Sequence, residues 1–482
     1  MQINPSLSEA KNTYFYTLST LLIVCVFLAI ATETILLVTI PLVALAGIIT
    51  IVNYRILYYF LIAGIPVSYK IYILPKLTTD LPVEPLMVLF LGIAIIELLI
   101  NWPIHKKIIN HPLVILILAG IIWSCICTLY SVDYVVSIKY LLAKLWYVGT
   151  FVIMAVIIGD SNKVWKKIFW LFYFSLLVAV TVTLIKHSFS LFSFDTVTKV
   201  ISPFFSNHVT YSTVVALFLP YVWIARGWFK KGTLTRSLLN FSIFLFLFAI
   251  ITSYTRATWL SIPCMIGYVI ILKKNYFSTF WLVVAISTTL LVGLLLYNNN
   301  YMRFSPDYEK TVFNKGNIDK HLEATYKLED VSGMERVYRW VAAKNMIADN
   351  PILGTGPNTF HPEYKKYTES EFRTYVSDNP EQSTTHNYFL MIFSEQGFPG
   401  FLLFVMLVYY TLKLSNRLYH KITDTESKNL VLAATLSIVV ILFHLLLNDL
   451  IETEKIGTMF YLAIAILISM DLRYKSLENK AG

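Results

Sequence analysis

Four side chains in this sequence combine a charge or a titratable ring with a position beside a long apolar segment. Arg256 opens an apolar run in "SYTRATWLS", and His386 stands in "STTHN" directly before another. Arg336 and Arg339 lie three residues apart in the polar segment between them, so a helix would present both on one face. Arginine binds phosphate oxygens with a fixed fork of donors, and histidine accepts a proton near neutral pH. These residue types could bind an anion and activate a hydroxyl group.

Each of these residues also has an ordinary structural explanation. Arg256 lies near Trp259, and this combination at the end of an apolar run is equally typical of an anchor at the membrane interface. An arginine pair at this spacing is more often solvated or bonded to a nearby acid such as Glu335. A histidine before a helix is as often a capping or interfacial residue. The chemical hypothesis therefore depends on whether the topology gathers these side chains.

The composition identifies the class of protein. Of the 482 residues, 57% are hydrophobic and only 14% are charged, and the mean hydropathy is +0.64. Such a chain cannot build the polar surface of a soluble globule, so it is predicted to be an integral membrane protein. The four cysteines lie in apolar runs without histidines at metal-ligand spacing, which argues against disulfides and zinc sites. We expect no metal and no cofactor.

Apolar windows of membrane-spanning length recur along nearly the whole chain. A helix needs about 20 apolar residues to cross a hydrocarbon core of roughly 30 Å. The windows predict an all-α polytopic membrane protein with about fourteen transmembrane helices. The predicted spans are 14–31, 34–52, 56–74, 85–101, 112–130, 136–158, 166–186, 209–226, 237–254, 257–273, 279–297, 387–412, 429–447 and 456–471.

Basic residues in alternate loops predict the orientation. By the positive-inside rule these loops are cytoplasmic, which places the protein in the cytoplasmic membrane with both termini inside. The net charge of +10 then faces the anionic leaflet, so the lipid bilayer explains it and no nucleic-acid partner is expected. The first apolar run is predicted to be a retained span. The basic clusters lie at 55, 106–107, 163–167, 226–236, 273–274, 413–428 and 473–475.

The opposite loops are then extracytoplasmic, and one of them is far larger than the others. The prediction places transmembrane helices 1 to 11 in residues 1–297 and an extracytoplasmic cap in residues 298–386. Helices 12 to 14 and a cytoplasmic tail follow in residues 387–482. This arrangement puts all four candidate residues on the outer side of the membrane, as a consequence of the charge pattern alone.

The cap is predicted to contain a helix followed by a tight turn. Helical periodicity covers 333–350, where Asn-Pro prevents continuation. The next residues, "NPILGTGPNTF", contain Gly-x-Gly without a preceding strand, and Pro357 blocks a nucleotide-binding helix start, so the glycines are assigned to a turn. Glu395 lies roughly 13 Å deeper than His386 along a helix. It is predicted to be a structural acid that bonds a neighbouring helix near a break at 397–400.

Three separated segments resemble the O-antigen ligase and Wzy-type polymerase superfamily. They are "TRATWL", the cap segment "MERVYRWVAAKNMIADNPILGTGPNTF" and "HNYFLMIFSEQGFPG", in this order. The resemblance covers residues from about 205 to 450, whereas the N-terminal half agrees only as a run of spans. Members often have two asparagines where this chain has Asn207 and His208, so no role is assigned to His208. The family signature falls on Arg256, Arg336 with Trp340, the turn of Pro351, Gly354 and Gly356, and His386 with Asn387.

The resemblance implies a GT-C-like, inverting membrane glycosyltransferase that uses undecaprenyl-diphosphate-linked glycans at the outer face without a metal. A diphosphate leaving group develops negative charge, which arginines must neutralise where no Mg²⁺ is available. Arg256 and Arg336 are predicted to form this clamp. Arg339 is predicted to assist it or to bond a nearby acid, and Asn387 to bind substrate. His386, with a pKa near ambient pH, is predicted to accept the proton of the attacking sugar hydroxyl.

The acceptor and the class of protein leave alternatives open. A polymerase passes the glycan to another lipid-linked repeat unit, and an O-antigen ligase passes it to a different acceptor. The Ile-, Lys-, Asn- and Tyr-rich composition suggests a low-GC genome and a cell without lipopolysaccharide, so we favour a polymerase, with a chain-length co-polymerase as an open partner. A secondary transporter or lipid-linked glycan flippase is the alternative from another class, favoured by Lys70, Lys139 and Lys144 in or near spans. A purely structural membrane subunit is the third.

Overall fold

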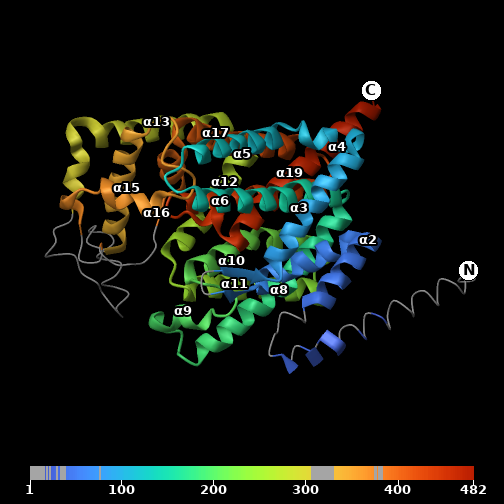
Figure 1. Cartoon of the computed structure of the whole chain (residues 1–482). Helices are drawn as coiled ribbons and strands as arrows, with labels where there is room; N and C mark the ends of the chain where they lie inside the picture. The colour runs from blue at the N-terminus through green and yellow to red at the C-terminus, as the bar shows by residue number, and fades with distance from the viewer. Residues whose placement is uncertain are drawn as a thin grey trace, which may run out of the picture. The chain divides into compact units, whose positions relative to one another are not determined.

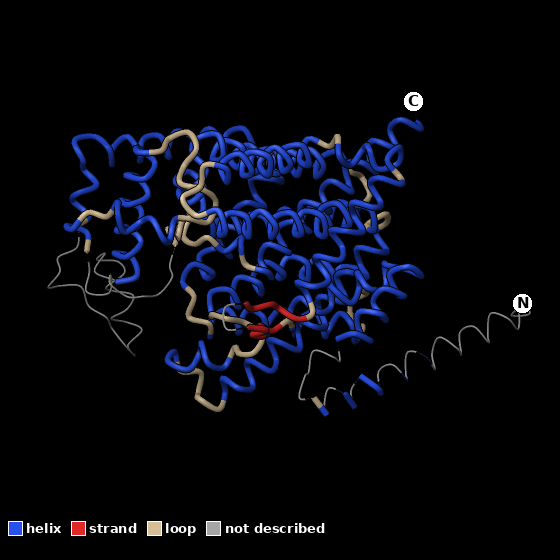
Figure 2. Tube along the Cα trace, viewed as in Figure 1, coloured by secondary structure: helices blue, strands red, loops and turns tan. Residues whose placement is uncertain are grey.

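The computed structural model describes residues 39–305 except 75–76, then 331–373, 377 and 384–481, with isolated positions between 17 and 32. Helices make up most of this described part, and its one sheet has two strands (Figure 2). Twelve of its helices are long and apolar enough to cross a membrane. The prediction of an all-α polytopic membrane protein is therefore confirmed.

The chain divides into two compact units, Met1–Ala63 and Gly64–Gly482. In the first, helix α2 (Thr39–Gly64) is broken at Asn53, whose φ of −167° and ψ of 91° are not helical. The Asn53 side chain accepts a hydrogen bond from the Arg55 N–H at 3.0 Å. A short polar side chain of this kind can replace a main-chain acceptor and start a new helical segment.

Helix α2 takes the place of two of the predicted spans. The windows 34–52 and 56–74 correspond to one candidate span, Ala44–Val67, and the residues after it are not helical. The predicted span 14–31 lies mostly outside the described residues. The chain then has one crossing fewer than predicted. An odd number of crossings would put the two termini on opposite sides of the membrane, so the cytoplasmic location of the N-terminus stays a prediction.

The second unit contains the other helices and a β-hairpin. The first half of its helices are α3 (Val83–Ile100), α4 (Trp102–Ile109), α5 (Pro112–Leu129), α6 (Tyr134–Val148), α7 (Ala155–Ile158), α8 (Asn162–Ser188), α9 (Val197–Val200) and α10 (His208–Ala225). The second half are α11 (Leu234–Thr252), α12 (Arg256–Lys273), α13 (Phe277–Leu296), α15 (Val331–Asp349), α16 (Phe360–Glu363), α17 (Tyr388–Lys421), α18 (Thr425–Leu445) and α19 (Glu454–Ala481). A π-helical turn joins α6 and α7 into one span.

The hairpin occupies the place where the sequence predicted the end of a span. Strands β1 (Tyr69–Leu74) and β2 (Leu77–Leu81) are antiparallel, with Lys70 opposite Asp80. Pro66 lies in a 3₁₀ turn after α2 and cannot donate a helical hydrogen bond, and the following "YKIYIL" is rich in β-branched and aromatic residues. Apolar content alone did not distinguish this strand from helix.

Helices α10, α18 and α19 form the centre of the second unit. In its most apolar window α19 is 94% buried and α10 is 83% buried, whereas α13 is not buried at all and presents its apolar side chains outward. Buried Ala433, Ala434 and Ser437 on α18 are small, so neighbouring helices can approach it closely. The central helices therefore hold the polar loops at their ends in fixed positions.

The cap helix α15 packs on its own small core. Its buried face contains Tyr338, Ala342 and Met346, which contact Phe360 and Phe372. Helix α15 corresponds to the predicted cap helix, 333–350, with ends that differ by one or two residues. Figure 1 shows α15 and α16 at one end of helices α5, α6 and α17. By the predicted orientation, this end is the outer one.

Candidate active site

Helix α17 is interrupted near the site, and the turn after α15 fills the interruption. Gly397 has a φ of 65° and a ψ of −172°, and Pro399 has no N–H, so helical hydrogen bonds are lost here. Three main-chain hydrogen bonds replace them: Thr355 N–H to the Ser394 carbonyl (3.1 Å), Gly356 N–H to the Glu395 carbonyl (2.9 Å) and Phe398 N–H to the Pro351 carbonyl (2.8 Å). The cap is thus bonded to the transmembrane helix through main-chain groups.

Glycine is required on both sides of this contact. A Cβ atom at Gly354, where φ is 67°, would lie 2.3 Å from the carbonyl carbon of Glu395. A Cβ atom at Gly397 would lie 2.0 Å from the carbonyl oxygen of Ile352. The predicted turn of glycines therefore exists, and its purpose is close approach of two main chains.

Glu395 connects the same two segments with its side chain. It is 1% exposed, and its two carboxylate oxygens accept hydrogen bonds from the N–H groups of Asn358 (2.9 Å) and Phe360 (3.0 Å). Glu395 was predicted to bond a neighbouring helix near the break. It does lie near the break, but its partners are main-chain groups that the turn before α16 leaves without helical acceptors.

His386 is held between the cap helix and the start of α17. Trp340 of α15 donates its indole N–H to the Thr385 carbonyl at 2.9 Å. His386 itself has a φ of 51°, a left-handed conformation that is uncommon outside glycine, although histidine is among the residues that adopt it more often. The side chain of Asn448, from the turn after α18, makes a hydrogen bond with the His386 ring. Three segments distant in sequence thus meet at this histidine.

The two cap arginines act on the protonation of His386. Burial and the nearby positive charges of Arg336 and Arg339 lower its pKa to about 3, although the Asn448 hydrogen bond acts in the other direction. The expectation of a pKa near ambient pH is therefore not met. The ring is neutral at pH 7, which is the form that can accept a proton.

Arg339 is bonded to an acid, one of the two roles that the sequence left open. Its guanidinium lies 3.3 Å from the Glu335 carboxylate, one helical turn earlier. Glu335 is 7% exposed and also accepts a hydrogen bond from the Ser377 hydroxyl at 2.7 Å. Because this pair is largely removed from water, it fixes the direction of the Arg339 side chain.

Asn387 has hydrogen bonds that are internal to the protein. Its Oδ1 accepts from the Leu390 N–H at 3.1 Å, so it caps α17, and its Nδ2 donates to the Leu446 carbonyl at 3.1 Å. These contacts fix the end of α18 beside the start of α17. Its predicted role in substrate binding stays a prediction.

Arg256 is the first residue of α12 and is connected to the same end of the unit through buried side chains. Thr258, two residues later, lies 3.4 Å from His444 Nε2 near the end of α18, and that end reaches Asn387 through the Leu446 carbonyl. A cation at a helix N-terminus faces the positive end of the helix dipole, which is unfavourable unless an anion is close. These links place Arg256 at the same end of the helices as the His386 group.

The turn between α18 and α19 supplies residues that the sequence reasoning missed. Asp449 is half-buried, accepts a hydrogen bond from the Thr384 hydroxyl and lies within electrostatic reach of Arg339. Burial raises the pKa of its carboxyl group, although these two partners lower it. The available signal was "LLLNDLIETEK", where polar residues interrupt two apolar runs on the predicted outer side.

The lysines that favoured a transporter have other environments. Lys70 is in the hairpin, outside the candidate spans, and Lys139 is exposed on α6. Lys144 donates to the Tyr140 hydroxyl at 2.9 Å, and Tyr140 donates to Glu452 at 3.3 Å. Tyr388, at the start of α17, also donates to Glu452, at 2.5 Å. Lys144 therefore belongs to a network that supports the start of α17.

The described residues were compared with the side-chain groupings that bind metal ions. Among the described residues, no group of three or more histidine, cysteine, aspartate and glutamate side chains could hold a metal ion. Of the predicted site residues, Arg336, Arg339 and His386 are brought together directly, and Arg256 is connected through α18.

Residues 241–405 match the family model described as O-Antigen ligase. The match extends from α11 through the cap to the part of α17 after the break, so it includes Arg256, Arg336, Arg339 and His386. It confirms the resemblance seen in the three sequence segments and indicates a function of the O-antigen ligase or polymerase type. Comparison with curated proteins gives no match.

Proposed function

We propose that the protein is an inverting glycosyltransferase that polymerises undecaprenyl-diphosphate-linked repeat units of a surface polysaccharide at the outer face of the cytoplasmic membrane. The observation that carries the proposal is the neutral, half-buried His386 beside Arg336 and Arg339, inside the segment that matches the O-antigen ligase family. A neutral base next to fixed positive charges is the arrangement that transfer from a lipid diphosphate needs.

The arginines would stabilise the leaving group. In the reaction the acceptor hydroxyl oxygen attacks the anomeric carbon while the bond between that carbon and the diphosphate oxygen breaks. Negative charge grows on the diphosphate, and Arg336 in the cap and Arg256 at the N-terminus of α12 would stabilise it. Arg339, fixed by Glu335, would contribute at longer range. This role for arginine would require no metal.

His386 would take the proton of the acceptor hydroxyl. Its low pKa results from burial and, in part, from the arginine charges. A bound diphosphate would offset these charges and raise the pKa of His386 toward neutrality. The histidine would thereby become a better base only when the donor is in place, which would limit proton uptake to the occupied site.

The second candidate is an O-antigen ligase, the activity named in the description of the matching family model, which covers ligases and polymerases alike. Both reactions use the same donor and the same three roles for the site residues. They differ in the acceptor: a second lipid-linked repeat unit for the polymerase, and a different glycolipid for the ligase. A chain-length co-polymerase would be a partner of the polymerase only.

Transfer with purified protein tests these alternatives. The full chain would be incubated with a short undecaprenyl-diphosphate oligosaccharide and a chelator, and the products separated by mass. Longer lipid-linked products that are lost in His386→Ala and Arg256→Ala would support the polymerase. Transfer only after a second glycolipid is supplied would indicate the ligase. Equal transfer by wild type and both variants would refute the residue roles, and transport without any transfer would favour the flippase.

A further inference from the structure

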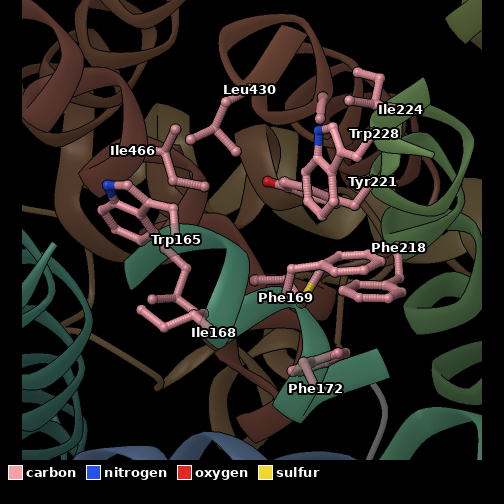
Figure 3. A pocket seen from close by; sticks show the side chains of 13 residues that line it. Trp165, Ile168, Phe169, Phe172, Phe218, Tyr221, Ile224, Trp228, Leu430 and Ile466 are labelled. Carbon is pink, nitrogen blue, oxygen red and sulfur yellow. The ribbon is translucent and has the colours of Figure 1, made fainter. Parts of the chain in front are cut away.

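A cavity lined by aromatic rings lies among α8, α10, α18 and α19, separate from the site at His386. We call it the aromatic cavity; its rings belong to Trp165, Phe169, Phe172, Phe218, Tyr221 and Trp228 (Figure 3). It contains about 560 Å³ of empty space, counting the part that is open to the outside.

The walls of the aromatic cavity are rigid and apolar. Phe169 stacks on Phe218 with ring centroids 5.4 Å apart, and its edge meets Trp228 at 5.2 Å. Figure 3 shows Trp228 and Tyr221 facing Trp165 and Ile466 across the space. A cavity with such walls offers little to a charged or hydroxylated ligand and favours a hydrocarbon chain.

The aromatic cavity lies at the ends of its helices that carry the basic clusters. Trp165 is in the first turn of α8, Trp228 ends the 3₁₀ turn after α10, and Leu430 is in the second turn of α18. By the positive-inside rule these ends are cytoplasmic. Trp228 and Leu430 are only partly buried, so the opening is beside the inner leaflet. The ligand would therefore come from that leaflet.

The rim of the aromatic cavity has an excess of positive charge. The Lys166 ammonium lies 5.1 Å from the centre of the Trp228 ring, but Glu426 offsets its charge at 2.7 Å. The nearby Asp424 is a further acid at this rim. Four exposed lysines on the adjoining segments outnumber these acids: Lys163 and Lys167 on α8, and Lys230 and Lys231 after α10. Such a cluster attracts an anionic headgroup.

We propose that the aromatic cavity binds an acyl chain of an anionic phospholipid from the cytoplasmic leaflet, with the headgroup phosphate at the lysines of α8 and of the segment after α10. The bound chain would fill the space between α8 and the central helices α10, α18 and α19. The inference does not depend on glycosyl transfer, because it concerns the other end of these helices.

The tryptophans of the cavity provide a direct test. The full chain would be reconstituted into phosphatidylcholine vesicles, and a brominated lipid would be added in increasing fractions. This lipid is either phosphatidylglycerol or phosphatidylcholine, in each case with brominated acyl chains, which quench tryptophan emission on contact. We expect saturable quenching by the brominated anionic lipid at a lower fraction than by the neutral one. Replacing Lys163 by Gln should shift the half-maximal fraction upward by about fivefold.

Two sets of variants assign the quenching to the cavity. In Trp165→Phe/Trp228→Phe the rings that line the cavity are kept but their emission is lost, so the saturable component should disappear. Trp281→Phe, on the outward-facing α13, is the matched control and should leave that component unchanged. Ala433→Phe, which fills the cavity from α18, should abolish the component; if this variant does not fold, the tryptophan pair still decides.

Three outcomes would overturn the proposal. Quenching that rises in proportion to the lipid fraction and equally for both headgroups would mean bulk contact only. A saturable component that survives in Trp165→Phe/Trp228→Phe would place the lipid elsewhere. Loss of the component on addition of an uncharged polyprenol, but not of unbrominated phosphatidylglycerol, would mean that the cavity takes an isoprenoid chain instead.

Discussion

The indole N–H of Trp340 on the cap helix donates to the main-chain carbonyl of Thr385, 2.9 Å away and one residue before His386. Through this bond the cap, rather than the transmembrane helix alone, sets the position of the candidate base. Because His386 has a left-handed main-chain conformation, the position of the preceding peptide group controls the direction of its side chain.

Replacing Trp340 by Phe should therefore impair turnover more than it impairs folding. The ring still packs on the cap, but the hydrogen bond is lost and the Thr385 carbonyl is left partly unsatisfied, at a cost of about 1 kcal/mol. Glycosyl transfer should fall by about tenfold or more, because a misplaced base loses its geometry. Initial rates and thermal unfolding of the same preparation check this. Trp259→Phe, which removes the hydrogen bond to the Ile250 carbonyl, is the control; an equal loss of transfer there would contradict the assignment.

The protonation of His386 should make the folded protein sensitive to acid. In the unfolded chain a histidine has a pKa near 6.5, whereas in the folded protein the pKa of His386 is about 3. Between these values the unfolded state binds a proton that the folded state does not, so the free energy of unfolding decreases as the pH falls from 6.5 toward 3. The midpoint of thermal unfolding should fall more steeply over pH 7 to 4 in wild type than in His386→Gln. Parallel curves would argue against a depressed pKa.

Removing one of the cap charges should raise the pKa of His386. In Arg339→Gln the repulsion on the protonated ring is weaker, so the acid limb of kcat/KM against pH should move to higher pH. Lys366→Gln, which changes an exposed cation of the cap, should leave the limb in place. A shift of the same size in both variants would assign the effect to the overall charge of the cap.

The main-chain contact between the cap turn and α17 should tolerate no side chain. In Gly397→Ala the new Cβ atom would meet the Ile352 carbonyl at 2.0 Å, and φ is 65°, so both strain and a displaced turn are expected. We expect a loss of stability of about 2 kcal/mol or more. Gly293→Ala in α13 is the matched control, since nothing lies within 4 Å of its Cβ position; it should be neutral or slightly stabilising. Thermal unfolding of the two variants distinguishes the cases.

The sequence predicted the helices well where apolar length decides, and less well where hydrogen bonds decide. The spans from 85–101 onward correspond to helices because a run of apolar residues can satisfy its main chain only as a helix in lipid. The β-hairpin after Pro66 and the break at Asn53 were missed, because both depend on local main-chain partners rather than on hydropathy. That site residues distant in sequence lie on the same side of the membrane could be predicted only from the topology.

The candidate site shows the same limit. His386 and the arginines stood out because their chemistry is unusual beside apolar runs. Asp449 did not, since an acid between two spans is typical of any outer loop, and only the fold shows that it lies beside Thr384 and Arg339. The expected pKa of His386 differs from the one in the structure because the loss of water around the ring, the largest cause of the low pKa, is a property of the folded chain.

Asp449 offers the test of whether the α18–α19 turn belongs to the site. In Asp449→Asn the shape is kept but the negative charge that faces Arg339 is lost, and hydrogen bonds to charged groups are worth about 1.5–3 kcal/mol. We expect transfer to fall by about tenfold or more while the thermal midpoint changes little, since burying a neutral amide costs less than burying a carboxylate. Asp349→Asn, which changes an exposed acid on the cap helix that carries Arg339, should keep full activity. Equal activity of wild type and Asp449→Asn, with the donor below its KM, would remove this turn from the site and leave the His386 group to the cap and α17 alone.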